Sequence, residues 1–212
     1  GYAFVEAPDH FEAQAAKDAT VNASGALKTV AVSLFKIAND LRWKSSGPRT
    51  GIAEISLPSL QPGSSIMPGT VNPVIAEMVM QVSSQVIGND AAITRGGANG
   101  NFELNVMMPL IAHNLLESVD LLATGSVVMR EKMVEGIEAD VERARWLLEQ
   151  NVIIITALVP VIGYDRSAEV AKKAFSEGRG VREVALEMGV LPADELEAAL
   201  DLRPMTEGGV VG

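Results

Sequence analysis

The residues best suited to chemistry lie in a glycine- and proline-rich segment at positions 63–73, GSSIMPGTVNP. It carries two serine hydroxyls, Ser64 and Ser65, and leads to a helix that we expect to begin at Pro73 with Asn72 as its N-cap. A helix N-terminus carries about half a positive charge and unpaired N–H groups, so it favours anions. The segment therefore predicts a site that stabilises a serine alkoxide or binds a carboxylate, with an ordinary capped loop as the alternative.

The composition argues against most other kinds of site. The 212 residues include no Cys and only two His, His10 and His113, so thiolate chemistry is excluded and neither a metal nor a cofactor site is expected. Acidic residues outnumber basic ones by 27 to 17, which gives a net charge of −10. The negative electrostatic potential that follows from this charge repels the phosphate backbone of nucleic acids, so no nucleic-acid partner is expected.

The elements that must position the segment are long helices. A helical rhythm runs from Pro8 to about Trp43, and its apolar residues recur at intervals of three and four, as in a coiled coil: Leu27, Val30, Leu34, Ile37 and Leu41. At 1.5 Å per residue such a helix is about 50 Å long. A stripe of that length predicts a helix bundle shared between subunits.

Three further long helices are expected after the loop at residues 44–72. The first runs from Pro73 to about Asn89 and the second starts near Phe102, with Pro109 as a kink. The third spans residues 126–150. Beyond it, a β-branched apolar stretch and short helical pieces separated by Gly and Pro predict a small second domain.

The sequence therefore predicts an all-α protein: a long-helix bundle at residues 1–142 and a small C-terminal helical domain at 143–212. No apolar run reaches the roughly 18 residues of a membrane span, so no membrane partner is expected. The N-terminus shows no basic region followed by an apolar core, so no secretory signal is expected either.

Residues 63–77, GSSIMPGTVNPVIAE, closely resemble the motif of the fumarase/aspartase superfamily. Other strings are similar to class II fumarases, so the resemblance extends over essentially the whole chain and corresponds to the C-terminal half of a fumarase subunit. These strings are SGALK at 24–28, KIAND at 36–40, GND at 88–90, GNFELNV at 100–106, IGYD at 162–165 and AEVAK at 168–172.

This resemblance implies reversible hydration of fumarate to (S)-malate, a step of the tricarboxylic acid cycle. It assigns Ser64 as the base and Glu77 as the acid that pairs with a His from the other half of the subunit. Contacts to the substrate carboxylate map onto four residues: Ser65, Thr70, Val71 and Asn72. It also implies a homotetramer located in the cytoplasm, or in the mitochondrial matrix of a eukaryote.

One departure from the family motif affects the chemistry. The family has Lys where this chain has Thr70, and that Lys stabilises the negative charge that develops during the reaction. Lys28, Arg49 or another subunit could supply the charge instead. A catalytically inactive structural homologue or fragment, and another lyase of the superfamily such as aspartate ammonia-lyase, are therefore the alternatives.

Overall fold

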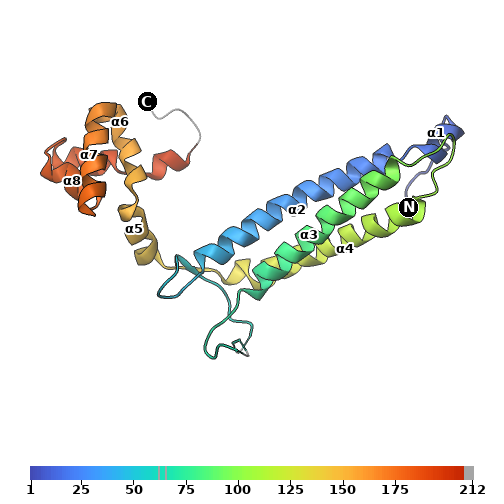
Figure 1. Cartoon of the computed structure of the whole chain (residues 1–212), viewed down its shortest axis with the longest axis horizontal. Coiled ribbons are helices and arrows are strands. Elements are labelled where there is room, and N and C mark those ends of the chain that lie inside the picture. The colour runs from blue at the N-terminus through green and yellow to red at the C-terminus, as the bar shows by residue number, and fades with distance from the viewer. Residues whose placement is uncertain (62, 65, 208–212) are drawn as a thin grey trace. The chain divides into compact units, whose positions relative to one another are not determined.

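The computed structural model describes residues 1–61, 63–64 and 66–207, and it is mainly helical (Figure 1). The all-α class predicted from the sequence is confirmed. The chain divides into two compact units, Gly1–Ala139 and Asp140–Gly212. Residues 140–142, which the sequence analysis assigned to the bundle, therefore fall in the second unit.

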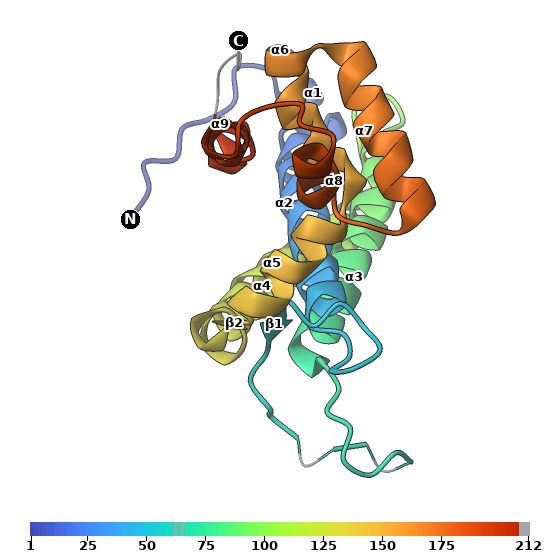
Figure 2. The same cartoon turned by 90° about the vertical axis from the view of Figure 1, so that its left-hand side faces the viewer.

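The first unit is built on three long helices that lie side by side in both views (Figures 1 and 2). They are α2 (Asp18–Lys44), α3 (Val74–Gly97) and α4 (Met108–Lys132), with a short α1 (His10–Ala15) before them. The single helix expected from residue 8 to 43 is wrong, because the chain leaves helical geometry at Ala16. The buried Asn105 explains this break: its backbone N–H donates to Gln14 O at 3.2 Å, and its side-chain amide donates to Ala15 O at 3.4 Å.

The expected apolar stripe of α2 is divided between core and surface. Its fully buried residues are small and seven positions apart: Ser24, Ala31 and Ala38. Leu27, Leu34 and Leu41 pack beside them against the bundle core. Val30 and Ile37, in contrast, are 48% and 46% exposed, so α2 keeps an exposed apolar face within the described part of the first unit.

The end of α4 differs from the sequence prediction. Pro109 does not kink the helix, because it lies in the first turn, where a missing N–H costs nothing. The helix expected at 126–150 is also wrong, since a 3₁₀ helix at Val134–Gly136 and a strand, β2 (Glu138–Ala139), interrupt it. Strand β2 pairs antiparallel with β1 (Ile55–Ser56). A Cβ on Gly136 would lie 2.5 Å from Pro58 Cγ, so this backbone approach requires glycine.

Buried polar contacts join the three long helices. Lys28 Nζ of α2 is 2.5 Å from Asp90 Oδ2 of α3, and Ser24 Oγ donates to Asp90 Oδ1 at 2.8 Å. On the other side of α3, Asn89 Nδ2 donates to Glu117 Oε2 at 2.8 Å and to Ser118 Oγ at 3.1 Å. These contacts fix the axial alignment of the helices.

The Asp90 contacts predict a pH-dependent contribution to stability. Burial raises the pKa of this carboxyl, but the hydrogen bonds from Lys28 and Ser24 and the Lys28 charge outweigh burial, so the pKa lies below its ordinary value. Ionised Asp90 therefore stabilises the fold above about pH 4, the unfolded value, and this contribution is lost as the pH falls through the folded pKa.

We expect Asp90→Asn to lower the free energy of unfolding by about 2 kcal/mol at pH 7, measured by urea denaturation followed by circular dichroism. The difference from the original chain should shrink below pH 4. Asp40→Asn is the control, because Asp40 forms an exposed pair with Lys36 on the same helix, and it should cost about 0.5 kcal/mol or less. An Asp90→Asn effect of equal size at pH 3 and pH 7 would contradict the ionic explanation.

The second unit is a compact helical cluster. It contains α5 (Val141–Gln150), α6 (Val159–Ile162), α7 (Tyr164–Glu177), α8 (Val181–Glu187) and α9 (Ala193–Ala199), with 3₁₀ helices at Val152–Leu158 and Arg203–Thr206. Ile154, Leu158 and Val170 lie in its core. Among the described residues no single helix is long and apolar enough to cross a membrane. Among those residues, one bent pair, Val141–Gln150 with Val152–Ile162 at 76°, passes the test by length and composition. Two residues of this pair, Ile154 and Leu158, are buried in the core of the unit.

Candidate active site

The serine-containing segment folds back on itself between β1 and α3. The Ser64 N–H donates to Thr70 O at 2.9 Å, and the Thr70 N–H donates to Met67 O at 3.2 Å. Gly63 and Gly69 hold φ angles of 120° and 83°, which side chains rarely allow. The described part of the segment extends beyond the end of the bundle (Figures 1 and 2).

Backbone donors surround the Ser64 hydroxyl. Its Oγ accepts the N–H groups of Ile66 and Met67 at 3.2 and 3.3 Å, and Ser64 itself is half-buried. Hydrogen bonds from N–H groups to a hydroxyl oxygen stabilise its anionic form. This geometry can therefore support a serine alkoxide.

Three of the four residues predicted to contact the substrate are exposed. Thr70, Val71 and Asn72 are exposed, whereas Ser65 lies outside the described residues. The Thr70 hydroxyl donates to Met67 O at 2.6 Å, so it is engaged within the loop. The expected Asn72 cap is wrong: α3 begins at Val74 with Pro73 in the N-cap position, and Asn72 contributes its carbonyl, which accepts the Val74 N–H at 2.9 Å.

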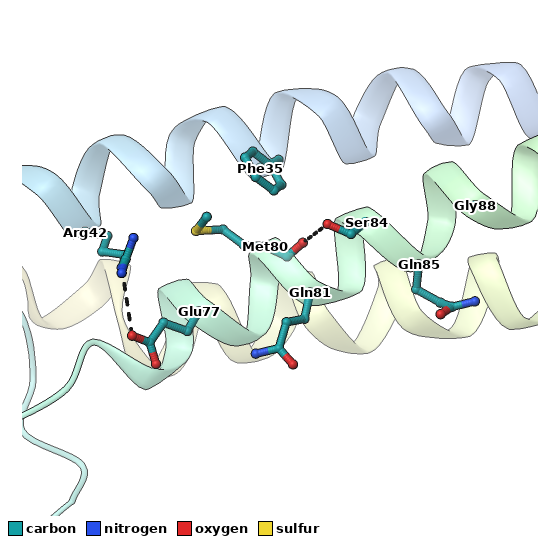
Figure 3. Close-up of a pocket in the computed structure, with 8 residues that line it drawn as sticks. All are labelled: Phe35, Arg42, Glu77, Met80, Gln81, Ser84, Gln85 and Gly88. Carbon is teal, nitrogen blue, oxygen red and sulfur yellow. Dashed lines mark hydrogen bonds and ion pairs between the residues drawn. The ribbon is translucent and has the colours of Figure 1, made fainter. Parts of the chain in front are cut away.

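Glu77 faces a groove between α2 and α3 (Figure 3). It lies in the first turn of α3, and its Oε1 is 3.8 Å from Arg42 Nε of α2. The groove has a volume of about 610 Å³. Its lining is mixed in polarity and consists of Phe35, Arg42, Glu77, Met80, Gln81, Ser84, Gln85 and Gly88.

The structure joins two of the predicted site residues directly. Ser64 and Thr70 are joined through their backbones. No hydrogen bond or ion pair links Ser64 to Glu77 within the described part of the chain. His10 and His113 are both exposed and outside the groove. Over the same described residues, no group of three or more His, Asp or Glu side chains is placed to hold a metal ion.

Arg42 and the polar wall of the groove were not predicted from the sequence. On α3, polar residues follow Glu77 at helical spacing, namely Gln81, Ser84 and Gln85. Steps of three and four residues place side chains on one face of a helix. This stripe was visible in the sequence, whereas the proximity of Arg42 depends on how α2 packs against α3.

Comparison with known proteins points to one family. A family model described as lyase matches residues 1–88, and one described as fumarase C C-terminus matches residues 154–207. Fumarate hydratase class II of Xylella fastidiosa is 51% identical over 210 residues, which are 99% of this chain and 44% of that protein. The corresponding protein of Mycobacterium tuberculosis is 53% identical over 205 residues, which are 95% of this chain and 43% of that protein.

A solved structure gives the same result for the fold. The recombinant class II fumarase from Schistosoma mansoni superposes with a TM-score of 0.89 at 34% identity, over 97% of this chain and 43% of that one. The chain is therefore similar to class II fumarases of the fumarase/aspartase superfamily over nearly its whole length, as its motifs predicted. It spans less than half the length of the curated relatives that it matches.

Proposed function

We propose that this chain supplies part of the active site of a lyase that interconverts fumarate and (S)-malate. The support is the similarity to class II fumarases together with the loop that holds Ser64. The relatives named fumarate hydratase are more than twice as long as the segment matched here. The activity therefore requires residues that this chain does not contain, including the His that would act with Glu77.

The observation that carries the proposal is the pair of N–H groups on Ser64 Oγ. In the dehydration direction, the base removes a proton from the carbon next to a carboxylate of malate, and the neighbouring hydroxyl leaves as water. Ser64 as an alkoxide would take that proton, since the two backbone donors stabilise its charge. The resulting dianion needs cations and N–H donors around its carboxylate.

The other site residues are assigned to the two groups of the substrate that need contacts, the carboxylate and the leaving hydroxyl. Ser65, Thr70, Val71 and Asn72 would bind the substrate carboxylate, in keeping with the exposed face that Thr70, Val71 and Asn72 present. Glu77 would pair with an imidazole on the side of the leaving hydroxyl. Among the described residues no hydrogen bond joins Glu77 to Ser64, in keeping with a site that is completed by other protein segments.

The test is to join this chain to the N-terminal region of the M. tuberculosis relative, up to the start of the matched segment. We expect this chimera to convert malate to fumarate, followed by ultraviolet absorbance, and the 212-residue chain alone to show no turnover. Catalysis requires that the groups from both halves of the subunit are held close together in the correct orientation. Turnover by the chain alone, or none by a folded chimera that carries Lys at position 70, would contradict the proposal.

We also propose that the chain assembles as a homotetramer. Apolar side chains remain exposed on α2 and α4: Val30 and Ile37 on the first, and Leu116 (64% exposed), Val119 and Val127 on the second. Exposed apolar surface of this extent on a bundle is typical of an interface.

Light scattering should therefore give a mass of four 22.4 kDa chains at micromolar concentration. Leu116→Glu should shift the mass towards the monomer, and Thr124→Glu, exposed on the same helix, should leave it unchanged. A stable, well-folded monomer of the original chain would disprove the assembly.

One observation favours a second candidate, a non-catalytic role in assembly. Thr70 brings no positive charge, and its hydroxyl is already engaged by Met67 O. A chain of this kind would keep the bundle surfaces without the chemistry. For either role we propose a cytoplasmic location, or the mitochondrial matrix in a eukaryote.

A further inference from the structure

The groove between α2 and α3 places a guanidinium beside the carboxylate of Glu77. Figure 3 shows Arg42 and Glu77 extending toward each other from the two helices. Arg42 lies near the end of α2 and Glu77 in the first turn of α3. Their side chains are 43% and 38% exposed, so both are also accessible from the groove.

Stability alone does not account for this ion pair. Half-exposed ion pairs contribute little to folding, and the 3.8 Å between Arg42 Nε and Glu77 Oε1 exceeds hydrogen-bond length. The pair's main physical consequence is orientation, because the guanidinium attracts one carboxylate oxygen. Within the part of the chain that the structure describes, no hydrogen bond engages Glu77 Oε2, which leaves that oxygen available to another partner.

We propose that Arg42 is a positioning residue for Glu77. By attracting Oε1, it would leave Oε2 directed to the groove, where the imidazole of the completed site would donate a hydrogen bond to it. A guanidinium suits this task because it stays charged at every physiological pH. This inference rests on the proposed function and adds to it a residue that the family motif in residues 63–77 does not contain.

The proposal separates two ways in which Arg42 could affect turnover. A positioning residue acts through Glu77, so its removal has no further effect once Glu77 has lost its charge. A cation that contacted the substrate directly would still matter in that background. A double-mutant cycle distinguishes the two.

The experiment uses the chimera described above, carrying Thr70→Lys. We expect Arg42→Gln to lower kcat by about 10- to 100-fold, the scale of a misplaced catalytic group, with KM changed by less than about twofold. Arg42→Lys should show a smaller fall, since it keeps the positive charge but places it differently. In a Glu77→Gln background, Arg42→Gln should change kcat no further. Lys36→Gln is the matched control, because it removes an exposed cation from the same helix, and it should leave kcat unchanged.

Two results would overturn the positioning role alone. One is an unchanged kcat in Arg42→Gln, and the other is a fall in kcat that is equally large with Glu77 present and in the Glu77→Gln background. If Arg42→Gln does not fold, the same comparison is made with Arg42→Lys. A fall in kcat that disappears in the Glu77→Gln background supports the positioning role, and any other result opposes it. A folded chimera without turnover would overturn the proposed function and the positioning role together, so the two failures are distinguishable.

Discussion

We expect the replacement of Thr70 by Lys in the chimera to raise kcat by about 100-fold or more, with a smaller change in KM. In the proposed reaction, the base removes a proton next to a carboxylate, which creates a dianion. A cation at position 70 acts chiefly where this charge develops, so it lowers the barrier more than it strengthens substrate binding. Loss of a single donor of this kind typically costs about 10²- to 10³-fold in rate.

The structure sharpens this expectation in two ways. The Thr70 hydroxyl donates to Met67 O at 2.6 Å. It is therefore not free to donate to the substrate in place of the Lys that the family motif has at this position. Lys28, which could otherwise supply the charge, is held by Asp90 on the neighbouring helix. Arg49 and residues of other subunits remain as alternative sources of positive charge.

Thr70→Gln is the matched control, because it also removes the hydroxyl and adds length but brings no charge. Its kcat should stay near that of the chimera with Thr70. Steady-state kinetics with malate over a range of concentrations separates kcat from KM for the three proteins. Equal turnover by the Thr70 and Lys versions would show that position 70 does not have the role assigned to it.

Ser64→Ala should lower kcat by about 10²- to 10⁴-fold, the range for removal of a general base. The measurement is best made in the Thr70→Lys chimera, where turnover is largest. The backbone N–H groups of Ile66 and Met67 that donate to Ser64 Oγ would then have no alkoxide to stabilise.

Ser59→Ala provides the control for this variant. Ser59 is an exposed serine of the same connecting segment, and its hydroxyl contacts Gln61 O. The substitution should leave kcat and KM unchanged. Retention of full activity by Ser64→Ala would instead assign the base to another residue.

Much of the candidate site could be predicted because it is local in sequence. The segment at 63–73 is defined by its own Gly, Pro and Ser residues, and the backbone conformations of Gly63 and Gly69 follow from the absence of a side chain. The start of α3 was displaced by one residue, and its cap was misassigned, because Pro73 and Asn72 both favour helix starts. Arg42 could not be found in this way, since it lies 35 positions before Glu77.

The sequence by itself determined the all-α class, the similarity to class II fumarases and the helical character of most segments, because apolar periodicity and local motifs record these directly. The tertiary structure decided where helices stop. Asn105 ends α1 by engaging the carbonyls of Gln14 and Ala15, and pairing of β1 with β2 interrupts a pattern that was locally helical. It also decided which apolar residues of α2 face the core, because Ala31 and Ala38 pack against α3 and α4 while Val30 and Ile37 do not. Such outcomes depend on partners distant in the chain, whose free energies of contact outweigh local helix preference.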